Sequence, residues 1–278
     1  GRIGGVDGVA LETEKWIDVL KLMGHEVFTL SGQFQERPMY PDHENLVPEM
    51  SFFSPESFWS QKKAFFYPET NVEELIEHLN LYSKVIYKKI LQWLLERKID
   101  LIISENASAL PSHLEMGMAI NKVVHKTGLP TITHDHDFAW ERGDRYRSPH
   151  KEINDFISEV FPLRAPSSVH AVINSHAVNT LKDRFDRDAV NVPNVMDFKQ
   201  AFGTRNQKNE NLAYHMGFRK TDLFLFQITR IVRRKGIESA IRLIHELNDK
   251  KVKLIITGNY ADDAGSSYYN ELVNQIHE

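Results

Sequence analysis

Short apolar runs alternate with amphipathic stretches along almost the whole chain, and this alternation limits the fold more than any other feature. In Leu223–Leu247, the run LFLFQI predicts a buried strand carrying Phe224, Phe226 and Ile228, and an amphipathic helix follows the turn TRIVRRKG. Strands that alternate with helices usually pair in parallel, because a helical crossover returns the chain to the same end of the sheet. We therefore expect an α/β protein with mostly parallel sheets.

The hydrophobic spacing predicts where the individual elements lie. Helices are expected at residues 12–23, 71–98, 113–127, 237–248 and 267–277, and strands at 26–30, 100–104, 129–133, 169–174, 190–192, 223–228 and 252–257. Trp16, Val19, Leu20 and Met23 should form the buried face of the first helix, and Ser175 should cap the helix after strand 169–174. Residues 31–70 have weak periodicity and are expected to form an irregular excursion.

The pattern restarts near residue 196, which predicts two domains. Residues 1–195 would form the first Rossmann-like domain and residues 196–278 the second. The second has only two clear strands and falls short of a doubly wound domain of roughly 100–150 residues. The chain also opens on Gly1 without a preceding strand. We expect a fragment that lacks part of the second domain and the first strand of the first.

Composition excludes several classes of protein. A net charge of -4 and a pI near 6.4 argue against a general nucleic-acid binder. The chain has no cysteine, which excludes disulfides, thiolate chemistry and Cys-based metal sites. No apolar run approaches the roughly 18 residues of a membrane span. We expect a cytoplasmic protein, with peripheral membrane contact left open.

The turn after strand 223–228 is strongly basic. It holds Arg230, Arg233, Arg234 and Lys235, and Gly236 opens the helix. Because the positive end of a helix dipole already lies there, added cations favour a bound anion, and a diphosphate fits best. A solvated basic loop is the alternative. The loop at Gly258 and Asn259 follows strand 252–257 at its carboxyl end and either faces the same ligand or is an acidic surface loop.

Two further segments are candidates for ligand contacts. Gly4 and Gly5 precede the first helix, where a backbone without Cβ atoms lets a phosphate approach closely, although a plain turn also explains them. His134, Asp135, His136 and Asp137 emerge from the end of strand 129–133, followed by Trp140. Ligands of open α/β sheets bind at carboxyl ends of strands, so an organic ligand site is expected there. A metal site on His134 and His136, completed by His113, Glu105 or His170, and simple loop capping are the alternatives.

Taken in order, these segments resemble the retaining glycosyltransferases of family 4. The matching motifs are Gly4-Gly5, Thr131-Ile-Thr-His134, Val172-Ile-Asn-Ser175, Pro193-Asn-Val-Met-Asp197 and Arg230-x4-Lys235-Gly236. The resemblance implies the GT-B fold, in which two Rossmann-like domains face a cleft. Here the first domain would lie on the acceptor side, and the incomplete second domain would bind the nucleotide-sugar donor.

The resemblance also implies the roles of individual residues. His134, Arg230 and Lys235 would be catalytic, with both cations on the donor diphosphate. Gly4, Gly5, Gly258 and Asn259 would bind the donor, and Asp135, His136, Asp137 and Trp140 would contact the acceptor or sugar. No cofactor or metal would be essential, and the acceptor would be a small molecule, lipid or glycan.

The family's Glu-x7-Glu motif has no counterpart before Glu278. Two other hypotheses therefore stay open beside the glycosyltransferase. One is a nucleotide-sugar-binding module with impaired catalysis, and the other is a metal-dependent hydrolase that uses His134 and His136.

Overall fold

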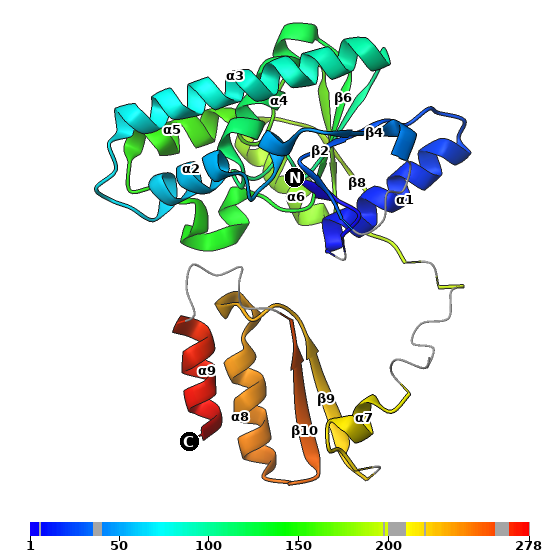
Figure 1. The fold of residues 1–278 in the computed structure, drawn as a ribbon, viewed down its shortest axis with the longest axis vertical. Helices are drawn as coiled ribbons and strands as arrows, with labels where there is room; N and C mark the ends of the chain where they lie inside the picture. Colours follow the sequence, from blue (N-terminus) through cyan, green and yellow to red (C-terminus); the bar gives the residue numbers. More distant parts are fainter. Residues whose placement is uncertain are drawn as a thin grey trace. The chain divides into compact units, whose positions relative to one another are not determined.

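The computed structural model describes residues 1–5, 7–35, 41–196, 198–199, 210–219, 221–258 and 267–277. The chain divides into two compact units, Gly1–Met196 and Asp197–Glu278, drawn in Figure 1. The boundary expected between residues 195 and 196 lies one residue before this division. The acceptor and donor roles of the two domains stay predictions.

The first unit is built around a parallel sheet. Its strands follow the order β5 (Ile102–Glu105), β6 (Thr131–Asp135), β7 (Ser168–Val172) and β8 (Ala189–Asn191). Two short parallel pairs join β1 (Arg2–Ile3) to β3 (Gln33–Phe34) and β2 (Thr29–Ser31) to β4 (Glu44–Leu46). In the main sheet Glu105 is the register partner of His134. The carboxyl ends of β5 and β6 therefore meet at one edge.

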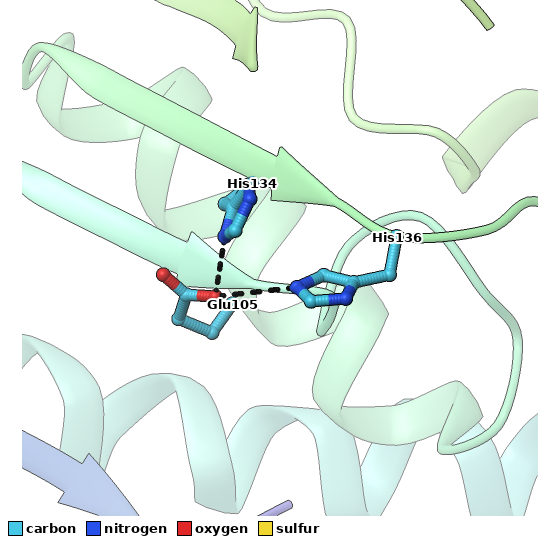
Figure 2. A group of neighbouring side chains, drawn as sticks. All are labelled: Glu105, His134 and His136. Atoms are coloured by element: carbon cyan, nitrogen blue, oxygen red, sulfur yellow. Dashed lines mark hydrogen bonds and ion pairs between the residues drawn. The ribbon is translucent and has the colours of Figure 1, made fainter. Parts of the chain in front are cut away.

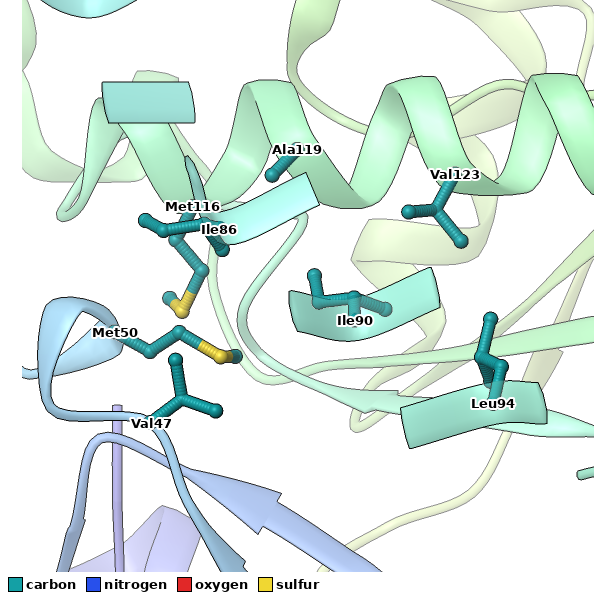
Figure 3. Packing of buried hydrophobic residues seen from close by; sticks show 8 residues of the cluster. All are labelled: Val47, Met50, Ile86, Ile90, Leu94, Met116, Ala119 and Val123. Carbon is teal, nitrogen blue, oxygen red and sulfur yellow. The ribbon is translucent and has the colours of Figure 1, made fainter. Parts of the chain in front are cut away.

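Helices α3 (Val72–Arg97) and α4 (Leu114–Thr127) carry much of the core of this unit. Asn71 caps α3 by accepting from two backbone N–H groups, and Gly128 ends α4 with a φ of 64°. Figure 3 shows side chains of α3 and α4 meeting residues of the 47–50 segment. The buried members are Val47, Met50, Ile86, Ile90, Leu94, Met116, Ala119 and Val123. Each large apolar side chain buried this way contributes roughly 1.5–3 kcal/mol to stability.

The remaining elements of the first unit complete the chain order. The helices are α1 (Gly8–Leu22), α2 (Pro55–Phe65), α5 (Lys151–Val160) and α6 (Ser175–Phe185), and the short 3₁₀ turns are η1 (Pro41–His43), η2 (Pro48–Met50) and η3 (Ala139–Tyr146). Helix α2 contradicts the expectation that residues 31–70 are irregular throughout. The Ser54 side chain accepts from Ser57 N–H and Pro55 occupies the first turn, so the segment has a regular helix start.

Three local predictions for this unit are wrong. Val19 and Met23 are exposed, because α1 buries the stripe of Ala10, Thr13 and Ile17 instead. The cap of α6 is Asn174, whose side chain accepts from Ala177 N–H, while Ser175 is the first helical residue. A short strand, β1, does precede the Gly4-Gly5 loop.

The second unit contains one parallel strand pair, β9 (Leu223–Ile228) and β10 (Val252–Thr257). Helices α8 (Ile237–Leu247) and α9 (Ser267–His277) pack with Leu254 and Ile256 of β10. The short helix α7 (Leu212–His215) precedes β9, and the 3₁₀ turn η4 (Arg233–Lys235) precedes α8. Both strands and both longer helices lie where the sequence predicts them.

The apolar face of β9 is not buried as predicted. In the register, Leu254 and Ile256 lie beside Leu225 and Gln227, so the packed helices cover that face. Phe226 and Ile228 alternate with these residues and point to the opposite face. They are 61% and 79% exposed.

Candidate functional site

Glu105, His134 and His136 form a partly buried cluster where β5 and β6 end. The Nδ1 atom of His134 lies 2.8 Å from the Oε2 atom of Glu105, and His136 Nε2 lies 3.9 Å from the same oxygen. Figure 2 shows both imidazoles converging on this carboxylate. The Trp16 ring lies 4.6 Å, centroid to centroid, from that of His134. The cluster therefore contains the register partners Glu105 and His134 and the residue just after β6, His136. The Trp16 ring of α1 packs against it.

Electrostatics keep Glu105 ionised. Burial by itself raises the pKa of Glu105, but hydrogen bonding and electrostatic contact with His134 and His136 outweigh it, so the pKa lies below its ordinary value of 4.5. An ionised carboxylate only accepts hydrogen bonds, so Nδ1 of His134 donates to it. In neutral His134, Nε2 is then the acceptor. That Nε2 atom is buried, and none of the described residues forms a hydrogen bond with it.

The same cluster has the composition of a metal site. Ligand atoms of Glu105, His134 and His136 all lie within 4.8 Å of one another. Nitrogen and carboxylate oxygen suit zinc, which binds both at about 2.0–2.2 Å. A cation bridging His134 Nδ1 and Glu105 Oε2 would displace the hydrogen bond between them. The expectation of no metal site stays a prediction.

The other polar residues at the end of β6 lie outside this cluster. Asp135 is buried on the opposite face, where its Oδ2 accepts from Thr133 and lies 2.9 Å from His170 Nδ1. Asp137 accepts from Asn106 and pairs with Arg142. Alternation along β6 explains the split, since neighbouring side chains point to opposite faces. The structure thus groups His134 with His136 but not with Asp135.

Trp140 lies on the 3₁₀ turn η3 and packs into the core rather than beside His134. Its ring stacks on that of Phe138, with centroids 4.5 Å apart and planes at 4°. The Arg184 guanidinium lies 4.8 Å from the Trp140 ring centroid. A contact of Trp140 with acceptor or sugar stays a prediction, and its present contacts are structural.

Gly4 and Gly5 connect β1 to α1. Gly4 has a φ of 81°, which favours glycine, and a Cβ at Gly5 would lie 2.6 Å from Gln35 Oε1. Asp7 caps α1 by accepting from Ala10 N–H and also pairs with Arg2. The positive φ therefore explains Gly4, and a phosphate contact of either glycine stays a prediction.

The basic turn of the second unit is partly neutralised within that unit. Arg233 donates to both carboxylate oxygens of Glu271, each at 2.7 Å. The first N–H group of α8, from Ile237, donates to the Tyr268 hydroxyl, which in turn donates to Glu238. The turn therefore does not depend on a bound anion alone to balance its charge. Glu271 and Glu238 supply part of that balance.

Arg230 and Lys235 lie at the two ends of this turn, and both are exposed. A Cβ at Gly258, whose φ is 102°, would overlap the backbone of Thr229 and Arg230. The segment after β10 therefore lies against the start of the basic turn, as expected for parallel neighbours. Asn259 falls outside the described residues.

A cavity of about 690 Å³ borders the cluster through Glu105 and Trp16. Most of its remaining wall is apolar, including Ile17, Phe28 and Ile102. The cations Arg2, Arg97 and Lys98 also belong to this wall. Among the described residues, no helix has the length and apolar character needed to cross a bilayer.

Comparison with known proteins relates the chain to sugar-transferring enzymes. No family model matches it. The mannosylglucosylglycerate synthase of Petrotoga mobilis is 31% identical over 261 residues, which cover 91% of this chain and 57% of that protein. The enzyme of the same name from Thermotoga maritima is 31% identical over 258 residues, covering 89% and 56%.

The fold points the same way. The crystal structure of WaaG, a glycosyltransferase involved in lipopolysaccharide biosynthesis, matches with a TM-score of 0.62 and 11% identity, covering 99% of this chain and 65% of WaaG. The chain is related to the GT-B glycosyltransferases. The α/β class and the partial GT-B fold are therefore confirmed, as is the resemblance drawn from the motifs. The chain spans little more than half the length of these curated relatives.

The sequence alone did not identify the role of Glu105 in this chain. It appeared only as one of several additional metal ligands, whereas the structure makes it the hydrogen-bond partner of His134. The sequence did place Glu105 at the end of one predicted strand and His134 at the end of the next. This placement was the signal that could have paired them. Neighbouring parallel strands bring such residues to one edge.

Proposed function

We propose that this protein transfers a glycosyl group from a nucleotide-diphosphate sugar to an acceptor, with retention of anomeric configuration and without an essential metal ion. The observation that carries the proposal is the relationship to mannosylglucosylglycerate synthases over about nine-tenths of the chain. Their name makes a mannosyl nucleotide and a glycosylated glycerate the first donor and acceptor to test. The acceptor could equally be another small molecule, a lipid or a glycan.

The site residues are assigned roles consistent with this reaction. Arg230 and Lys235 would bind the donor diphosphate and stabilise the negative charge that grows on the leaving nucleotide. Gly4, Gly5 and the loop at Gly258 and Asn259 would approach the donor through their backbone. Both cations are exposed, which supports their part because an exposed side chain is accessible to a ligand.

His134 would contact the donor sugar near the reacting centre. Its position at the carboxyl end of β6 supports this role, since ligands of such sheets bind at that edge. His136 is next to it, and Asp135, Asp137 and Trp140 complete the set proposed to contact acceptor or sugar. Among these, His136 has the strongest support because it alone shares the Glu105 cluster.

The diphosphate contact is tested in the full-length natural protein. Arg230→Ala with Lys235→Ala should abolish binding of nucleotide sugars in calorimetry and release of nucleoside diphosphate in turnover. Arg234→Ala, a neighbouring exposed cation of the same turn, is the matched control and should retain both. Wild-type binding by the double variant would refute the diphosphate role.

The same experiments distinguish the alternative functions, a binding module and a hydrolase, from the glycosyltransferase. Donor binding without product would indicate a binding module with impaired catalysis. Turnover that survives EDTA dialysis supports metal-independent transfer, and NMR of the product reads the anomeric configuration. Stoichiometric zinc or manganese in the purified protein, with no binding of UDP, GDP or ADP sugars, would favour a hydrolase at His134 and His136.

A further inference from the structure

We propose that Glu105 is a positioning residue, whose carboxylate fixes the ring orientation and tautomer of His134 so that Nε2 accepts a hydrogen bond from a hydroxyl group of the bound sugar. This inference rests on the proposed function, because it takes His134 as the sugar contact. Glu105 itself would not touch the substrate. The residue acts through His134, from the neighbouring strand.

Backbone geometry places the two residues together. Glu105 and His134 are register partners on adjacent parallel strands, so their side chains leave the same face of the sheet side by side. The Nδ1–Oε2 distance of 2.8 Å is that of a charge-assisted hydrogen bond. Such a bond is roughly twice as strong as a neutral one, and it needs no loop to hold it.

Packing prevents the imidazole from turning away. His134 is only 1% exposed, and its ring contacts those of Trp16 and His136, with both centroid distances at 4.6 Å. A ring flip would break the hydrogen bond between Nδ1 and the Glu105 carboxylate, so one orientation is held.

The second ring nitrogen of His134, Nε2, indicates a contact with a ligand. Nε2 of His134 is buried and has no hydrogen-bond partner among the described residues, which is unfavourable for a polar atom. A sugar hydroxyl donates to a neutral imidazole nitrogen of this kind. The ionised Glu105 keeps the proton on Nδ1, which is the tautomer that such a contact requires.

The tautomer is tested directly by NMR of ¹⁵N-histidine in the full-length protein. Wild type should show His134 with a protonated Nδ1, assigned through the His134→Gln variant. Glu105→Ala should remove this signature. Glu105→Gln, whose amide oxygen can still accept, should largely retain it and guards against misfolding of the alanine variant.

Turnover gives the second readout. Glu105→Ala should lower kcat roughly 10- to 100-fold, the loss typical when the partner that orients a metal-bound histidine is removed. Binding of free UDP or GDP should not change, because Arg230 and Lys235 are intact. Glu105→Gln should recover most of kcat. The exposed Glu77→Ala on α3 is the control.

The two proposals fail in different ways. A wild-type protein that neither binds nor turns over nucleotide sugars overturns the proposed function. An active wild type whose Glu105→Ala variant keeps kcat or the Nδ1 signature overturns the positioning role. Stoichiometric zinc that is lost with Glu105→Ala would also overturn it, since the carboxylate would then be a metal ligand.

Discussion

Replacing Glu115 with glutamine tests the electrostatics of the core of the first unit. Glu115 lies in the first turn of α4 and is fully buried. Its carboxylate oxygens lie 3.2 Å from His113 Nδ1 and 3.4 Å from His78 Nε2. Burial alone raises the pKa of Glu115, but the close approach of the His113 and His78 rings to its carboxylate outweighs it and lowers the pKa to about 2.

The lowered pKa of Glu115 corresponds to a contribution to the free energy of unfolding. A fall from 4.5 in the unfolded chain to about 2 in the folded one corresponds to about 3 kcal/mol at neutral pH, since each pKa unit is worth ~1.4 kcal/mol. Because the folded pKa is the lower one, the contribution is present above about pH 4.5 and is lost as the pH falls towards 2. Glu115→Gln should therefore destabilise the first unit by up to about 3 kcal/mol at pH 7.

Urea denaturation followed by tryptophan fluorescence measures this effect. All four tryptophans, Trp16, Trp59, Trp93 and Trp140, lie in the first unit, so the signal reports its unfolding. The difference between wild type and Glu115→Gln should shrink to about half near pH 3.

The matched control is Glu73→Gln. Glu73 also lies in the first turn of a helix, α3, but is exposed. Equal stability of the two variants at pH 7 would refute the reasoning. So would a Glu115→Gln deficit that does not narrow towards pH 3.

Two glycine substitutions test close approaches within each unit. Gly117→Ala should destabilise the first unit by about 1–3 kcal/mol, because the new methyl group overlaps the buried Phe161 ring, and the urea midpoint measures this. A loss below 0.5 kcal/mol would show that Phe161 moves aside freely. Gly258→Ala should increase hydrogen exchange in β9 and β10, since its φ of 102° is strained for alanine and its Cβ overlaps Thr229. Unchanged exchange in both strands would contradict that contact.

The elements that could be predicted from the sequence are those whose own residues determine them. The helix at α3 has a long regular apolar stripe and an Asn71 cap, and β9 has an uninterrupted apolar run. The exposed side of β9 could not be predicted, because burial depends on which helices cover which face. Helix α1 shows the same limit, since it buries Glu12 and Thr13 but leaves Leu11, Val19 and Leu22 exposed.

The candidate site shows a similar division. That polar residues lie at the end of strand β6 was visible in the sequence, and the alternation of side chains along a strand accounts for the separation of His134 and His136 from Asp135. The pairing of Glu105 with His134 depends on β5 lying next to β6 in register, which a linear sequence does not state. Likewise, Glu271 is far from Arg233 along the chain, and only the packing of α9 beside α8 brings them together.

The register between β5 and β6 holds Glu105 beside His134. Shifting either strand by one residue would turn Glu105 or His134 to the opposite face and break their bond. The loops that follow the two strands are not needed to hold this pair. Changes in those loops can therefore occur while the Glu105–His134 geometry is kept by the sheet.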